Sequence, residues 1–128
     1  MKIGTPREVF EGEARVAMTP DSALQLQKLG FDCVLESGAG VLAGFSDAAY
    51  RGSGVEIVAT AAALWKTADV IAKVRPPTAT EAKRLKSGQT LISFFWPAQN
   101  QAQMAQLAKK GANVIAMDMV PRISRAQK

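Results

Sequence analysis

The chain has 128 residues, of which 48% are apolar and 21% charged, a composition that predicts one globular domain with an ordinary core. Its formal net charge is +5, but Arg122, Arg125 and Lys128 supply three of these charges. The remaining net charge of +2 reflects a near balance of acidic and basic residues, which does not suggest nucleic-acid binding. The absence of histidine and the single cysteine exclude histidine-based catalytic triads, most zinc sites and an internal disulfide.

Short apolar runs alternate with amphipathic stretches along the chain, and we interpret them as strands and helices in turn. The expected elements are strand 2–5, helix 20–29, strand 31–36, helix 47–51, strand 55–58, helix 61–66, strand 70–74, helix 79–85, strand 90–94, helix 101–110 and strand 113–117. No run reaches the roughly 18 apolar residues of a membrane span, and we expect no direct membrane insertion.

Several helix ends carry recognisable signals. Thr19 precedes Pro20 as an expected N-cap, and Gly30 supplies a left-handed stop after the same helix. Thr78 with Glu81, and Asn100 with Gln103, have the spacing of capping boxes. These signals, with five strand–helix repeats, predict an α/β fold with a Rossmann-like or flavodoxin-like open parallel sheet and helices on both faces.

In such a sheet ligands collect beyond the carboxyl ends of the strands, where loops 5–15, 73–77, 93–97 and 120–128 would meet. These loops would bring together four cations that suit a carboxylate or a phosphate: Arg15, Lys73, Arg75 and Arg122. Lys73 and Arg75 would lie on an otherwise apolar strand, 70–74, and its continuation. Taken singly, each of the four is more often a surface charge.

Two further motifs receive structural interpretations. Residues 38–43 fit the Gly-x-Gly-x-x-Gly/Ala dinucleotide pattern, and nucleotide binding at Gly38 and Gly40 stays open as the less favoured alternative. The fingerprint needs a helix that opens within the turn and an acidic residue after the next strand, whereas here a loop separates the glycines from the next helix and Glu56 precedes or opens the next strand. Lys83, Arg84 and Lys86 form a small cationic cluster, which we interpret as a solvated helix end. Cys33, within an apolar run, is expected to be a core thiol in a reducing compartment.

Three stretches near the start of the chain resemble the amino-terminal domain shared by alanine dehydrogenases and transhydrogenase alpha subunits. They are Met1-Lys2-Ile3-Gly4-Thr5-Pro6-Arg7-Glu8, Glu13-Ala14-Arg15-Val16-Ala17-Met18-Thr19-Pro20 and Glu36-Ser37-Gly38-Ala39-Gly40. Two later stretches, Ser93-Phe94-Phe95-Trp96-Pro97-Ala98-Gln99-Asn100 and Pro121-Arg122-Ile123-Ser124-Arg125-Ala126-Gln127, resemble the proton-translocating NAD(P) transhydrogenase. Alanine dehydrogenases instead carry lysine at the position of Arg75 and histidine at that of Trp96, with which they bind and deprotonate substrate. Indole nitrogen is only a donor and cannot replace that base.

The resemblance implies that residues 1–128 form one amino-terminal domain of a transhydrogenase alpha subunit, truncated before the dinucleotide-binding domain. Arg122 and Gln127 would contact the nicotinamide end of NAD(H), although the family's later aspartate is missing and Lys128 stands where serine is usual. No catalytic residue and no metal ligand are expected, because hydride passes directly between two nicotinamides.

The implied function is the NAD(H)-side component of an enzyme that transfers hydride from NADH to NADP+, with the isolated chain inactive. Its partners would be the remaining alpha segment and membrane-embedded and NADP(H)-binding chains, which place it in the cytoplasm, peripheral to the inner membrane. An alternative from another class is a non-catalytic remnant or small-anion-binding module that uses Arg15, Lys73, Arg75 and Arg122.

Overall fold

The computed structural model describes residues 1–94 and 97–117, which form a parallel sheet with connecting helices. The strands are β1 (Lys2–Thr5), β2 (Asp32–Glu36), β3 (Glu56–Val58), β4 (Val70–Ala72), β5 (Thr90–Ser93) and β6 (Asn113–Ala116). The helices are α1 (Pro20–Lys28), α2 (Asp47–Gly52), α3 (Ala61–Thr67), α4 (Ala79–Arg84) and α5 (Pro97–Lys109), with a short 3-10 helix, η1, at Val41–Ala43. The elements therefore occur in the expected order.

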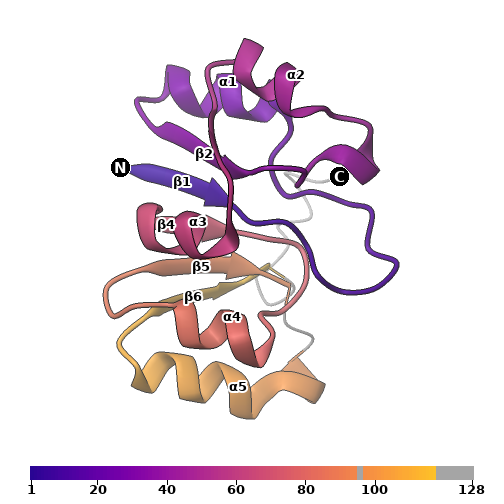
Figure 1. Ribbon diagram of the computed structural model, residues 1–128. Coiled ribbons are helices and arrows are strands. Elements are labelled where there is room, and N and C mark those ends of the chain that lie inside the picture. The colour runs from indigo at the N-terminus through magenta and orange to yellow at the C-terminus, as the bar shows by residue number, and fades with distance from the viewer. Residues whose placement is uncertain (95–96, 118–128) are drawn as a thin grey trace, which may run out of the picture.

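The strand order is β3-β2-β1-β4-β5-β6, and every pairing is parallel (Figure 1). This order is that of the Rossmann fold rather than of flavodoxin, and it confirms the predicted class of sheet. The order reverses between the neighbouring strands β1 and β4, since the chain builds outward from β1 to β3 and then crosses back. In open α/β sheets, ligand crevices form at this switch point.

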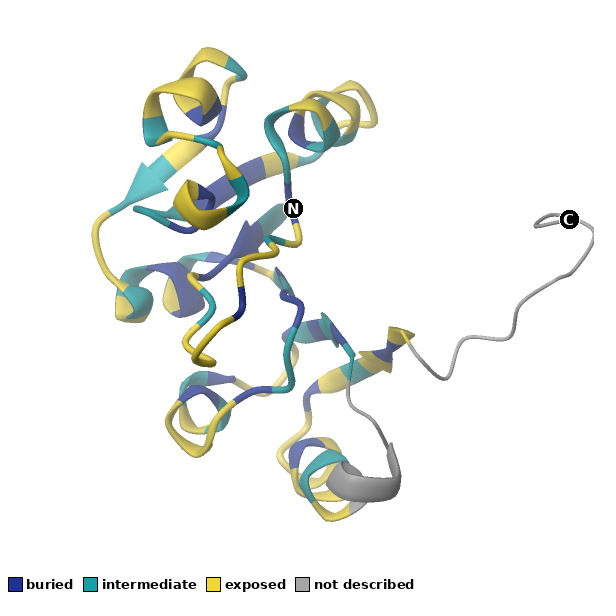
Figure 2. Ribbon diagram, turned by 90° about the vertical axis from the view of Figure 1, so that its right-hand side faces the viewer, coloured by how far each residue is buried: buried dark blue, intermediate teal, exposed yellow. Residues whose placement is uncertain are grey.

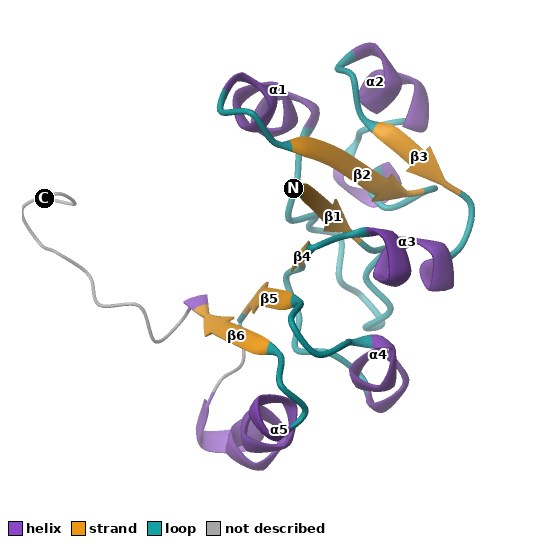
Figure 3. Ribbon diagram, turned by 90° about the vertical axis from the view of Figure 1, so that its left-hand side faces the viewer, coloured by secondary structure: helices purple, strands orange, loops and turns teal. Residues whose placement is uncertain are grey.

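Two apolar clusters cover the two faces of the sheet. Helices α1 and α2 pack with Ile3, Cys33 and Leu35 on one face, whereas α3, α4 and α5 pack with Ile71 and Leu91 on the other (Figure 3). Buried residues concentrate in the strands and on the inward sides of the helices (Figure 2). The buried position of Cys33 confirms the expected core thiol, and burial raises its pKa.

Helix α3 makes the crossover between the two halves of the sheet and packs closely on β1. A Cβ atom added at Gly4 would lie 2.6 Å from Ala68 Cβ and 3.0 Å from a methyl group of Leu64. The absence of a side chain at Gly4 therefore lets the crossover helix approach the central strand. This close approach places α3 against β1, and the chain then continues into β4, which pairs with β1 at the switch point.

The capping signals at Thr19 and Thr78 are confirmed, since each hydroxyl accepts a backbone N–H three residues later in a capping box. The predicted box at Asn100 is wrong, because α5 already begins at Pro97 and Asn100 lies inside the helix. Proline suits the first turn of a helix, where its missing N–H has no acceptor to lose.

The predicted strand 70–74 is too long, since β4 ends at Ala72. The backbone N–H of Lys73 still donates to Ile92 of β5 at 3.0 Å, but the amides of Val74 and Arg75 donate to the carboxylate of Glu8, at 2.6 and 3.3 Å. Lys73 and Arg75 therefore lie in the turn after the strand. They reach the carboxyl edge of the sheet as expected, but the strand-face argument for them is wrong.

Candidate functional site

The loop that follows β1 and the turn that follows β4 meet at the switch point and form a network of six charged residues. We call it the switch-point network: Glu8, Glu13, Arg15, Lys73, Arg75 and Glu81. The structure thus brings together three of the four cations predicted from the sequence. Each of the three contacts a glutamate.

Lys73 forms the buried half of the network. Its side chain is 1% exposed, and its Nζ lies 3.0 Å from Glu8 Oε1 and 3.5 Å from Glu81 Oε1. The same amino group donates to the carbonyl oxygen of Arg75 at 2.6 Å. Burial raises the pKa of Glu81, whereas the neighbouring Lys73 opposes that shift. Lys73 therefore ties the β1 loop, the β4 turn and the start of α4 to one another.

Glu13, Arg15 and Arg75 form the other half of the network, in which the two arginine side chains are more accessible than Lys73. Its carboxylate accepts from the backbone N–H, Nε and Nη2 of Arg15, all within 2.9 Å, and from Arg75 Nε at 2.8 Å. The guanidinium of Arg75 also lies 3.9 Å from the ring centroid of Phe10. The hydrogen bond from Arg15 is the main cause that lowers the pKa of Glu13 to about 2; burial opposes it and Arg75 adds to it.

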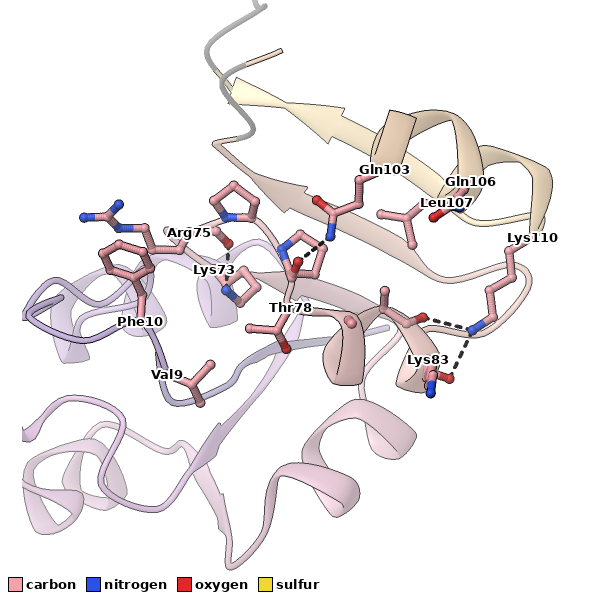
Figure 4. A pocket seen from close by; sticks show the side chains of 14 residues that line it. Val9, Phe10, Lys73, Arg75, Thr78, Lys83, Gln103, Gln106, Leu107 and Lys110 are labelled. Carbon is pink, nitrogen blue, oxygen red and sulfur yellow. Dashed lines mark hydrogen bonds between the residues drawn. The ribbon is translucent and has the colours of Figure 1, made fainter. Parts of the chain in front are cut away.

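Two clefts flank the network. The larger, of about 820 Å³, runs between α4 and α5 from Phe10 and Arg75 to Lys83 and Lys110 (Figure 4). The smaller, of about 460 Å³, lies between the β1 loop and the 38–42 turn, and Arg15 lines it. The side chain of Arg15 is 60% exposed, against 28% for Arg75. An anion entering the smaller cleft would therefore meet Arg15 already engaged with Glu13.

The carboxylates are what the sequence interpretation missed. Glu8 and Glu13 lie in the same loop as Arg15, and this local excess of acidic residues was the available signal. Their pairing with Lys73 and Arg75 spans more than 60 residues of sequence, and only the sheet order brings them together. With three glutamates on three cations, the network is close to neutral and holds loops together.

The turn after β2 does not form a phosphate cradle. The backbone N–H of Gly38 donates to Asp47 Oδ1 at 2.9 Å, and the hydroxyl of Ser37 donates to Oδ2 of the same carboxylate at 2.6 Å. The 3-10 helix η1 follows, whereas the dinucleotide fingerprint requires an α-helix. A Cβ atom at Gly40 would lie 2.5 Å from the ring of Tyr50. Packing and the Asp47 contact thus account for both glycines.

Arg122 and Gln127, the residues expected to contact nicotinamide, lie outside the described residues, as does Trp96. Within the described part of the chain, no group of three or more potential metal-ligating side chains of histidine, cysteine, aspartate or glutamate occurs. Over the same residues, no helix has both the length and the apolar character that a bilayer crossing requires.

Comparison with known proteins gives the family. The family model described as alanine dehydrogenase/PNT, N-terminal domain, matches residues 4–128. The chain belongs to this family. It is 70% identical to the NAD(P) transhydrogenase subunit alpha of Cereibacter sphaeroides over 129 aligned positions, which cover all of this chain and 24% of that protein. The chain thus spans about a quarter of the length of this relative.

Two solved structures share the fold. A transhydrogenase from Sinorhizobium meliloti superposes with a TM-score of 0.92 at 38% identity, over 99% of this chain and 38% of that one. An L-alanine dehydrogenase superposes with a TM-score of 0.90 at 30% identity, over 98% of this chain and 34% of that one. The Rossmann-like α/β architecture and the resemblance to transhydrogenase alpha subunits are therefore confirmed.

Proposed function

We propose that this chain is the NAD(H)-side component of a proton-translocating NAD(P) transhydrogenase. The observation that carries the proposal is the 70% identity, over the full chain, to a transhydrogenase alpha subunit. In the proposed enzyme, hydride passes from NADH to NADP+, and the NADP(H) lies on a partner domain. The chain works in the cytoplasm, held at the inner membrane by its membrane-embedded partners.

The residues at two positions support transhydrogenation over alanine oxidation. Arg75 stands where alanine dehydrogenases carry lysine, and in this chain it donates to Glu13 and lies over Phe10. Trp96 stands where they carry a histidine base, and tryptophan cannot accept a proton. Direct hydride transfer requires orientation of two nicotinamides and no protein base.

The 38–40 turn does not fit a dinucleotide pyrophosphate, because Asp47 already occupies the Gly38 N–H. We therefore assign the pyrophosphate to another part of the assembled enzyme. This domain contributes the scaffold of the switch-point network and, through Arg122 and Gln127, contacts to the nicotinamide end.

A small-anion-binding module receives less support from the described residues. Glu8, Glu13 and Glu81 already contact Lys73, Arg75 and Arg15, and an anion would have to compete with these carboxylates. Phosphate or pyruvate would raise the melting temperature of such a module, because a ligand that binds only the folded state stabilises it. We expect no such shift.

The test measures two reactions of the assembled enzyme that contains this chain. Reduction of a spectrally distinct NAD+ analogue by NADPH is expected, and alanine-dependent reduction of NAD+ is not. Arg122→Ala and Gln127→Ala should each slow the first reaction about tenfold to a hundredfold through misplacement of the nicotinamide, with Arg125→Ala as the matched control. Alanine oxidation, or equal rates in all three variants, would contradict the proposal.

A further inference from the structure

Six cations gather at the amino edge of the sheet, opposite the switch-point network. Because helices in a parallel α/β fold run back against the strands, the carboxyl ends of α3, α4 and α5 all reach this edge. We call these residues the basic belt: Lys66 in the last turn of α3, Lys83 and Arg84 in that of α4, Lys86 just after it, and Lys109 and Lys110 at the end of α5.

Hydrogen bonds join the three helix ends into one block. Lys86 Nζ donates to the carbonyl of Lys66 at 3.1 Å, which links α4 to α3. Lys110 Nζ donates to the carbonyls of Ala82 and Lys83, at 2.9 and 3.0 Å, which links α5 to α4 (Figure 4). The cations of the belt are therefore presented together on one side of the molecule.

The charge of the belt is not neutralised within the described part of the chain. None of its six cations forms an ion pair there, and five of them are exposed. Residues 57–117 contain only two acidic residues, Asp69 and Glu81. Asp69 accepts from the backbone N–H of Lys2, and Glu81 is buried against Lys73. The helix macrodipole favours a cation at each helix end, but six cations exceed that need.

We propose that the basic belt is a docking surface for an anionic phospholipid bilayer. Five of the six cations are lysines, which act as compact, strongly hydrated point charges on flexible stems. A bilayer that contains anionic lipid presents a diffuse negative potential, which attracts such clusters without fixed contacts.

Other polyanions fit the belt less well. Among the described residues, none of the exposed large apolar side chains lies in it, although a protein interface usually has an apolar or aromatic centre. Within the same residues, it has no exposed aromatic side chain on which bases of a single-stranded nucleic acid could stack. The contact is therefore electrostatic and peripheral, and salt weakens it.

Docking through the belt has a consequence for the site. The belt and the switch-point network lie at opposite edges of the same sheet. The network follows the carboxyl ends of strands, whereas the belt lies at the carboxyl ends of helices, which run in the opposite direction to the strands. A bilayer held against the belt leaves the network and the smaller cleft facing water, whereas the larger cleft reaches the belt at Lys83 and Lys110. The inference does not depend on the proposed function.

Co-sedimentation with lipid vesicles tests the proposal. The full chain should bind vesicles of phosphatidylcholine mixed with phosphatidylglycerol at low salt, and should bind neither pure phosphatidylcholine vesicles nor the mixed vesicles at high salt. A Lys83→Gln/Lys109→Gln variant should bind about thirtyfold more weakly, at about 1 kcal/mol per cation.

The matched control is Lys28→Gln/Arg51→Gln. These two exposed cations also end helices, α1 and α2, on the other face of the sheet, and the control removes the same charge. It should bind almost as well as the unchanged chain. Equal losses in the two variants, binding to pure phosphatidylcholine, or binding to duplex DNA in place of anionic vesicles would overturn the proposal. Circular dichroism confirms that both variants are folded.

Discussion

Glu8 is predicted to be the residue whose charge matters most to the stability of this domain, and the variant that tests this is Glu8→Gln. The carboxylate is 3% exposed and accepts from Lys73 Nζ at 3.0 Å and from the backbone N–H groups of Val74 and Arg75. Glutamine keeps the size of the side chain. It removes the negative charge and turns an NH₂ group towards donors.

The expected loss of unfolding free energy is about 2–4 kcal/mol. Breaking a buried ion pair by removing one partner typically costs about 3–5 kcal/mol, because a buried charge loses its compensation. Lys73 keeps Glu81 at 3.5 Å and the Arg75 carbonyl oxygen at 2.6 Å, which reduces the loss. Since the free energy of unfolding of a small domain is about 5–15 kcal/mol, a change of this size is easily measured.

The assay is urea unfolding at neutral pH, followed by circular dichroism. Glu11→Gln is the matched control, because Glu11 is exposed in the same loop and forms no hydrogen bond or ion pair with other described residues; it should change stability by less than about 0.5 kcal/mol. A combined Glu8→Gln/Lys73→Met variant should lose less than the two single variants added together, because it leaves neither charge of the pair unmatched. A loss below about 1 kcal/mol for Glu8→Gln, or strict additivity, would refute the reasoning.

Three further variants test the packing and the charges. Glu13 has a pKa lowered from 4.5 to about 2, and its charge therefore stabilises the fold fully above about pH 4.5. The unchanged chain should exceed Glu13→Gln in unfolding free energy by about 1 kcal/mol there, after allowance for solvent screening. This difference should vanish as the pH falls towards 2. Gly40→Ala should cost about 2–3 kcal/mol, because its Cβ displaces the buried Tyr50 ring, whose hydroxyl donates to the Met18 carbonyl at 2.7 Å. Thr5→Val should leave stability unchanged or raise it by about 1 kcal/mol, because the buried Thr5 hydroxyl has no hydrogen-bond partner.

Matched controls accompany these variants in chemical unfolding experiments. Gly52→Ala should be neutral or stabilising, since nothing lies within 4 Å of a Cβ at Gly52, which ends α2. Thr60→Val should cost about 1 kcal/mol, because the Thr60 hydroxyl caps α3 by accepting the Ala63 N–H. Equal changes in stability for Gly40→Ala and Gly52→Ala would contradict the packing argument at Gly40. A loss for Thr5→Val as large as that for Thr60→Val would contradict the interpretation of the Thr5 hydroxyl. A stability difference between Glu13→Gln and the unchanged chain that does not depend on pH would contradict the role of the Glu13 charge.

Most local signals in the sequence were reliable, although the capping box expected at Asn100 was wrong because α5 already begins at Pro97. The caps at Thr19 and Thr78, and the stop at Gly30 with its φ of 97°, require only neighbouring backbone groups. The prediction failed where a distant group is involved: strand β4 ends at Ala72, and beyond Lys73 the amides of Val74 and Arg75 donate to Glu8, more than 60 residues earlier. A period-two pattern carries no information about such a contact.

The sequence predicted where the candidate site lies in the fold, but not how its charged groups pair. The order of strands and helices was enough to bring Arg15, Lys73 and Arg75 to one edge of the sheet, since all follow strands that end there. Their pairing with Glu8 and Glu13 could not be inferred, because charge alone does not say which groups meet. The three cations were expected as a candidate anion site, and the structure adds that each is paired with a glutamate and links neighbouring loops.

The sequence by itself determined the succession of strands and helices, the parallel character of the sheet and the family resemblance, because periodicity, capping and residue identity are local. The tertiary structure alone decided that β1 lies beside β4, that the switch-point network is close to neutral and that six cations share one edge. Each of these depends on which distant segments become neighbours, and this is set by packing, as at Gly4 beneath α3.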